Sequence, residues 1–463
     1  MIPSSLEFLE PRIAPAILLS PQSFSYIDID GDDVRVTFSK PILTQANFDS
    51  IVNISGGLAG TGAQDLIGLD LFNLGPTVNG LNITITAKPS PDFGGDHVIS
   101  GVYVDAANFD EMTQLITGID LGKVNIDGDL TYIDAGDDNL NTLTIKSLSV
   151  KSVGLAEPGV ASDFFGAVGP IKVTGNFAGD FFADSVGAFD FDFAKITIGR
   201  SILGNLGENA GRIAAAGGIG PVFVGGDIVG GSTDGTGTLR SATDITKVTI
   251  NGSLIGSDGA ETGRIRAFSI GPVLIKGSLI GGFGDRSGVI ETFALDIASI
   301  TINGSILGGL GEGAATISAG EGFDDDGRIG NILVKGSVIG VLPESGNPAA
   351  GLTIRADDSI TKIKILGALV NANIVAGVDP GTDGEYATED DTLTAGFPNA
   401  LRRLGPVTIL GGVSATMPGF GITASVIASI QAGGPVLKPG GPFADFTNGF
   451  LLGGGSGIAV IEI

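Results

Sequence analysis

The stretch ITKVTINGSLIGSDGAETGRIRAFSIGPVLIKGSLIGG, from Ile245 to Gly282, contains nearly the same phrase twice. The phrase VTINGSLIG returns as VLIKGSLIG after 25 residues. A fixed period of this size is typical of a solenoid or an array of propeller blades, in which each structural unit stacks on the next. The spacing of this phrase along the chain therefore decides the fold.

The central glycine of the phrase recurs along much of the chain. The intervals are 26, 25, 27, 32 and 31 residues for Gly226, Gly252, Gly277, Gly304, Gly336 and Gly367. Four further positions fit the series more loosely, namely Gly128, Gly175, Arg200 and Gly412. The repeats therefore occupy most of the chain.

Each repeat contains three short apolar stretches, which are Lys247–Ile250, Ser253–Gly256 and Gly263–Ala267 in one unit. In the first stretch, alternation predicts that Val248 and Ile250 point inward. A propeller blade would need about 40–50 residues. We therefore predict an all-β fold, a parallel β-helix (β-solenoid) of roughly 12 coils with repeats of about 25–31 residues.

Glycine and serine mark the corner between the first two strands of each coil. We expect the glycines to adopt positive φ, which a residue without a Cβ enters easily. The serines that follow are expected to stack and to satisfy backbone groups of the turns. They are Ser201, Ser253, Ser278, Ser305 and Ser337.

The chain divides into four parts. Residues 1–20 form an N-terminal segment, and residues 21–116 form a small antiparallel β domain with longer alternating strands such as DDVRVTFSK. Residues 117–430 hold the solenoid repeats, and residues 431–463 form a C-terminal cap. Both caps are expected because an open solenoid end exposes unpaired strand groups. The acidic loop 378–400 is expected to be an insertion.

The charge balance limits the function classes. The 51 acidic and 25 basic residues give a formal charge of -26. Binding to nucleic acid or an anionic membrane needs clustered Lys and Arg, so both are disfavoured and cations are favoured. The absence of cysteine excludes disulfides and thiolate metal sites. The sequence contains no apolar run of about 18 residues, so no membrane span is predicted.

A dense acidic turn, DIDGDD, is the first candidate metal site. Its carboxylates, Asp28, Asp30, Asp32 and Asp33, resemble the start of a calcium loop. Counted from Asp28, however, Asp33 is at the sixth position, where an EF-hand needs Gly, and Ser39 is at the twelfth, where it needs Glu. The alternative is a structural turn without an ion.

The edge of the rod is the second candidate. Asp285 in GGFGD and Glu312 in GGLGE each follow their repeat glycine by 8 residues, so they are expected to line one edge. Stacked carboxylates repel, and calcium would relieve the repulsion. Loops that fan into water would also relieve it, and both motifs differ from the nonapeptide calcium repeat.

The sequence disfavours catalysis. His97 is the single histidine, and the chain has no cysteine, so a catalytic triad or a zinc centre has few possible members. The predicted outward positions of the best-defined strand carry no cluster of carboxylates. We expect a protein that is not an enzyme. The alternative, by analogy of fold, is a polysaccharide-active enzyme or a glycan-binding protein on a parallel β-helix.

The string FLEPRIAPA (Phe8–Ala16) resembles the LEPR-type N-terminal motif of large planctomycete and verrucomicrobial surface proteins. YIDIDGDDVRVTFSK, LGKVNIDGDL and the INGSLIG coils are similar to long secreted proteins of those bacteria. The resemblance implies an extracellular or cell-surface location and a structural or adhesive role. The partners it suggests are extracellular polysaccharide, other surface proteins or copies of the chain itself.

Overall fold

The computed structural model describes residues 16–55, 57, 63–89, 95–110, 112, 115–137, 139, 142–184, 191–320, 327–343, 345–382, 386, 388, 390–394, 402–438, 450–452 and 457–463. Residues 1–15, which hold most of the predicted N-terminal segment and of the FLEPRIAPA motif, lie outside the described residues.

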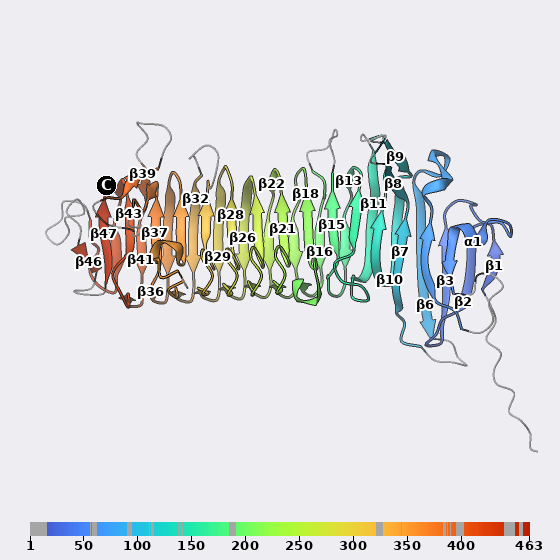
Figure 1. Ribbon diagram of the computed structural model, residues 1–463, viewed down its shortest axis with the longest axis horizontal. Coiled ribbons are helices and arrows are strands. Elements are labelled where there is room, and N and C mark those ends of the chain that lie inside the picture. The colour runs from blue at the N-terminus through green and yellow to red at the C-terminus, as the bar shows by residue number, and fades with distance from the viewer. Residues whose placement is uncertain are drawn as a thin grey trace, which may run out of the picture.

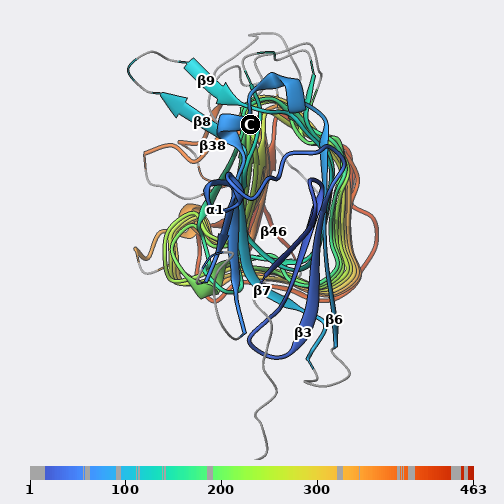
Figure 2. The ribbon, with the colours of Figure 1, turned by 90° about the vertical axis from the view of Figure 1, so that its right-hand side faces the viewer.

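The quoted repeat forms one coil of three short strands, as predicted. They are β23 (Val248–Ile250), β24 (Leu254–Ile255) and β25 (Arg264–Ala267). Their in-register parallel partners in the next coil are β26 (Ser269–Ile275), β27 (Leu279–Ile280) and β28 (Ile290–Thr292). Figure 1 shows these coils stacked into a rod, and Figure 2 shows them superposed when the rod is viewed from its end. The parallel β-helix is confirmed.

The stacked strands form three long sheets. The third strands of the coils build a 12-stranded sheet, the second strands an 8-stranded sheet, and the first strands belong to a 23-stranded sheet that also contains the N-terminal strands. Ten of the twelve strands in the 12-stranded sheet belong to coils, and the other two lie at the C-terminal end. Each coil therefore buries its apolar face against its neighbours.

Alternation along the first strand sets the core. Val248 and Ile250 are 0% exposed, whereas Thr249 between them is half-buried on the outer side. The equivalent side chains of neighbouring coils stack on them through the parallel register. Full burial of such a side chain contributes roughly 1.5–3 kcal/mol. The predicted inward rows are confirmed.

The expectation of positive φ at the repeat glycines is wrong. Gly252 and Gly277 do not belong to the glycines of positive φ. They are glycines because the coils approach closely there: a Cβ on Gly277 would collide with Ser253 Oγ and lie 2.7 Å from the carbonyl oxygen of Gly252. Positive φ is found instead at the corner before the third strand, as at Gly263, with φ of 58°.

The predicted serine stack is confirmed. The Oγ of Ser253 accepts a hydrogen bond of 3.0 Å from the backbone N–H of Ser278. Ser278 Oγ accepts one of 3.1 Å from Ser305, and Ser305 Oγ accepts one of 3.1 Å from Ser337. The hydroxyls thus tie successive corners together along the rod.

The N-terminal cap is continuous with the rod. Its strands β2 (Ser23–Ile27), β3 (Asp32–Phe38) and β6 (Leu81–Pro89) pair in antiparallel fashion, as expected. The expectation fails for β5 (Leu66–Asp70) and β7 (Ile99–Asp105), which pair with each other in parallel as the strands of the coils do. β6 then pairs in parallel with β10 (Leu121–Asp134), the first long strand of the solenoid. The blue strands of Figure 1 therefore extend the sheet that runs along the rod.

The C-terminal end carries a further strand, as expected. β47 (Ile458–Glu462) pairs in parallel with β43 (Phe420–Ala424), and β46 (Phe450–Leu451) pairs with β47 in antiparallel fashion. β47 therefore covers the last coil of the 12-stranded sheet.

The acidic loop packs on the rod through its described residues. β38 (Val378–Asp379) and β39 (Thr392–Leu393) pair at its base, and Tyr386 is 3% exposed in a small cluster with Val375. The acidic side chains of Asp383, Glu385 and Glu389 lie outside the described residues. Tyr386 of the insertion therefore covers apolar surface of the rod.

Candidate metal centre

A tight turn brings the N-terminal carboxylates together. It joins β2 to β3, whose register pairs Ile27 with Asp33. Asp28 Oδ1 accepts hydrogen bonds from the backbone N–H groups of Gly31, at 2.9 Å, and Asp32, at 2.6 Å. Gly31 has a φ of 104°, which a residue with a side chain rarely adopts.

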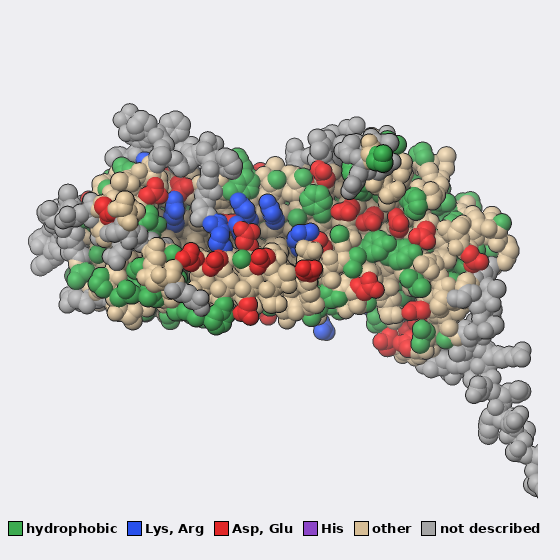
Figure 3. All heavy atoms as spheres, viewed as in Figure 1, with side chains coloured by type: hydrophobic (Ala, Val, Ile, Leu, Met, Phe, Trp, Pro, Cys, Tyr) green, Lys and Arg blue, Asp and Glu red, His purple; other side chains and the backbone are tan. Residues whose placement is uncertain are grey.

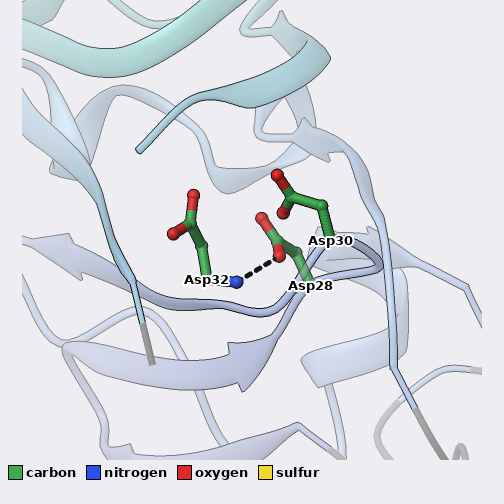
Figure 4. Close-up of side chains that lie close together, drawn as sticks. All are labelled: Asp28, Asp30 and Asp32. Atoms are coloured by element: carbon green, nitrogen blue, oxygen red, sulfur yellow. Dashed lines mark hydrogen bonds between the residues drawn. The ribbon is translucent and has the colours of Figure 1, made fainter. Parts of the chain in front are cut away.

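Three carboxylates of this turn, Asp28, Asp30 and Asp32, form a cluster that we call the acidic turn. Each offers one oxygen atom, and these atoms all lie within 4.8 Å of one another. Figure 4 shows Asp28 between the other two side chains. Asp28 and Asp32 are buried, whereas Asp30 is exposed, so the cluster opens to solvent on one side only.

Asp32 is the most unusual member of the acidic turn. Its side chain is 0% exposed, and neither carboxylate oxygen has a hydrogen-bond partner among the described residues. Gly95 lies directly against it, because a Cβ at that position would collide with Asp32 Oδ1. A buried carboxylate without a partner is strongly destabilising unless a cation or a proton compensates it.

Asp28 and Asp30 share a proton in the metal-free turn. Burial, followed by the hydrogen bond with Asp30, raises the pKa of Asp28 to about 7. The same hydrogen bond lowers the pKa of Asp30. Protonated Asp28 therefore donates a hydrogen bond to ionised Asp30, and a cation that binds all three carboxylates must displace the proton of Asp28.

Two further carboxylates lie close to the acidic turn. Asp96 hydrogen-bonds to Asp30, and the charge of Asp30, after burial, raises the pKa of Asp65. The Tyr26 hydroxyl is buried without a hydrogen-bond partner among the described residues, and burial raises its pKa well above the ordinary value. Sequence reasoning missed these neighbours because they come from separate segments that only the folded cap brings together.

The donor set fits calcium. Ca²⁺ takes 6–8 oxygen ligands at about 2.3–2.6 Å, so ligands on opposite sides of the ion lie about 4.6–5.2 Å apart. The oxygen atoms of the acidic turn fall within that limit. Asp28, Asp30 and Asp32 would hold the ion, and Asp96 lies within reach of Asp30. Mg²⁺ demands shorter distances, about 2.0–2.1 Å, in near-ideal octahedral geometry.

The other predicted ligands lie elsewhere. Asp33 is exposed on the opposite side of β3, because successive residues of a strand alternate between faces. Asp285 and Glu312 do lie in neighbouring coils, where Asp285 Oδ1 accepts a 2.9 Å hydrogen bond from the backbone N–H of Glu312. Among the described residues, the acidic turn is the one cluster of three or more close metal-ligating side chains, and it includes none of these three.

A second acidic feature, the aspartate row, was not predicted. Asp70, Asp105 and Asp134 are in-register partners on adjacent strands, and the backbone N–H of Asp163 donates to Asp134 Oδ1 over 2.8 Å. Burial raises the pKa of Asp105 to about 6 and that of Asp134 to about 7. No single stretch of sequence reveals the row, because its members are about 30 residues apart and depend on strand register.

Searches of protein-family models, curated proteins and solved structures find no match to this chain. Within the described part of the chain, no helix has the length and apolar character required to span a membrane.

Proposed function

We propose that this chain is a non-enzymatic structural and adhesive β-solenoid of the bacterial cell surface or extracellular space, whose N-terminal cap is fixed by calcium. The observation that carries the calcium part is the buried carboxylate of Asp32, which has no hydrogen-bond partner among the described residues and lies beside two further carboxylates. The structural part is supported by the sheet that the cap shares with the rod. Because the strands are hydrogen-bonded to one another, an ion that stabilises the cap also stabilises the first coils.

The construction of the rod supports a structural role. Parallel ladders run from the first coils to the C-terminal strand, and aliphatic and phenylalanine side chains fill the interior of the described coils. In such a stack each coil is stabilised by its neighbours, so the rod resists bending and local opening. It also offers a long lateral surface for adhesion.

The chemistry of the acidic turn supports an extracellular setting. Calcium sites of extracellular modules have dissociation constants of about 10⁻⁴–10⁻³ M, so they fill where calcium is abundant. An ion that binds only the folded cap stabilises it according to occupancy. The likeness of the FLEPRIAPA motif and of the coil phrases to bacterial surface proteins supports the same location.

The location is tested on cells that produce the chain naturally. Antibody labelling in electron micrographs should mark the outer surface or the surrounding matrix. Label restricted to the cytosol would contradict the proposal. On the purified protein, calcium should slow amide hydrogen exchange in residues 16–38 relative to a chelator, while exchange in the central coils should stay the same.

A further inference from the structure

A basic groove lies on the outer face of an otherwise acidic protein. Figure 3 shows a row of Lys and Arg side chains along the middle of the rod, bordered by acidic ones. The groove crosses β15 (Asp180–Ala183), β18 (Arg212–Ala215), β21 (Thr238–Ser241), β25 and β28 of the 12-stranded sheet. We call it the arginine groove and define it by Phe182, Arg212, Arg240, Arg264, Arg266 and Phe293.

Strand register places two of these arginines side by side. Arg240 and Arg266 are direct partners of the parallel strands β21 and β25, one strand spacing of about 4.8 Å apart. Like charges at such positions repel and disfavour the fold. A pair of this kind is stabilised when an anion lies between or above the two guanidinium groups.

The carboxylates nearby neutralise only part of the groove, because Asp180 pairs with Arg212 and Glu261 pairs with Arg264. Arg240 has no ion pair with any described carboxylate, and the Nε of Arg266 lies 3.3 Å from Glu291 without a hydrogen bond. Glu291 is shared, because it also pairs with Arg264 and Arg286. Glu291 thus contacts three guanidinium groups, and Arg240 is the arginine of the groove that has no ion pair with a described carboxylate.

Arg266 lies in a partly buried and positively charged environment. Burial, and after it the positive charges of Arg264 and Arg240, lower the pKa of Arg266. The guanidinium carbon of Arg266 also lies 5.4 Å from the ring centre of Phe293, within the range of a cation–π contact. Around the groove, five guanidinium groups lie beside three paired carboxylates, an excess of positive charge in a chain of formal charge -26. The five are Arg212, Arg240, Arg264, Arg266 and Arg286, and the three are Asp180, Glu261 and Glu291.

The groove has the shape of a site for an extended chain. A hollow of about 520 Å³ is lined by Arg212, Arg240, Arg266 and both phenylalanines, with small side chains at its floor. Phe182 is 38% exposed and offers a flat apolar surface. At the N-terminal end of the groove, the strand-register partner of Phe182 is Asp163. The carboxylate of Asp163 would repel an anionic ligand, so the groove ends there.

We propose that the arginine groove binds a linear acidic polysaccharide, specifically a polyuronate. The carboxylate on each sugar matches the two parallel N–H donors of a guanidinium group. The spacing between coils, about 4.8 Å, is close to the length of one pyranose unit, so successive carboxylates can meet arginines of successive coils. The apolar faces of the sugar rings pack on Phe182 and Phe293. The proposal rests on the adhesive part of the proposed function and names its partner.

Binding is tested by calorimetry with a galacturonic acid oligosaccharide long enough to cross the five strands, at low salt and without added calcium. The protein should bind it, and salt should weaken the binding. Arg240→Gln and Arg266→Gln should each lower the affinity about tenfold, as expected for a lost hydrogen bond between charged groups. Phe182→Ala should weaken binding without changing the charge.

Arg200→Gln is the matched control, because Arg200 is an exposed arginine outside the groove. It should leave the affinity unchanged. Equal binding of a neutral oligosaccharide of the same length, selective binding of a sulfated one, or unchanged affinity in the Arg240→Gln, Arg266→Gln double variant would overturn the proposal. Chromatography of the oligosaccharide after incubation tests the proposed function separately. Shortened oligosaccharide would refute the non-enzymatic role, but binding that depends on Arg240 and Arg266 would still support the arginine groove.

Discussion

The Oγ of Ser278 accepts a hydrogen bond of 3.1 Å from the backbone N–H of Ser305 in the next coil. This contact recurs along the corner and requires that the glycine before each serine lie close to the preceding coil. At Gly277, a Cβ would meet Ser253 Oγ and the backbone of Gly252. The corner thus couples one hydroxyl and one missing side chain in the four successive coils that contain Gly252–Ser253, Gly277–Ser278, Gly304–Ser305 and Gly336–Ser337.

Gly277→Ala should therefore destabilise the rod. Because the added methyl group meets backbone atoms that cannot move independently, we expect a loss of about 1–3 kcal/mol, measured by denaturant unfolding. Gly412→Ala is the matched control, since no atom lies within 4 Å of a Cβ there. Equal losses for both variants would show that glycine is needed at this corner for another reason.

Ile250→Asp should unfold at least the neighbouring coils. Ile250 is 0% exposed, so the substitution buries a charge without a partner and should cost about 4 kcal/mol or more. Thr249→Asp, on the outer side of the same strand, should change the thermal midpoint little. If the two variants melted alike, the inward and outward assignment of β23 would be wrong.

Stability should fall as the pH rises from about 4 to 7. Burial raises the pKa of Asp28 and Asp134 to about 7 and that of Asp105 to about 6, above the ordinary value of 3.8. The folded protein therefore binds more protons than the unfolded chain in this window, and its stability decreases with pH. In the absence of calcium, Tm should be higher at pH 5 than at pH 8.

Asp134→Asn separates this effect from general charge repulsion. Asparagine keeps an oxygen that accepts the hydrogen bond from the backbone N–H of Asp163 but cannot ionise. The variant should gain stability at pH 8 and show a smaller difference between the two pH values. An unchanged difference would mean that the aspartate row does not contribute.

The local pattern of the sequence predicts the coils but not the surfaces that depend on register. Alternation within one short stretch identifies the inward Val248 and Ile250. The repeat period aligns the serines, because each serine has the same place in similar stretches. The arginine groove joins Arg240 and Arg266, which differ in sequence context and become neighbours only through pairing of β21 with β25. Both arginines belong to the 12-stranded sheet of third strands, whereas the clear alternation in the sequence is that of the first strands.

Part of the metal centre could be predicted for the same reason. Asp28, Asp30 and Asp32 belong to one turn, so their spacing reveals them. Strand alternation also separates Asp33 from Asp32, but this requires knowing where β3 begins. The burial of Asp32 depends on Gly95, which is 63 residues away in the sequence, and only the folded cap shows that contact.

Calcium binding to the acidic turn is the most direct test of the account. Calcium at about 1 mM should raise Tm more than sodium chloride of equal ionic strength, with a stabilisation of about 0.4–1.4 kcal/mol for a site of extracellular affinity. Asp32→Asn should raise Tm without calcium, because it removes a buried unpartnered charge, and should abolish the calcium effect. Asp33→Asn, on the opposite side of the strand, should retain it. Equal effects of calcium and sodium on the wild-type protein would indicate screening alone and contradict the calcium-fixed cap.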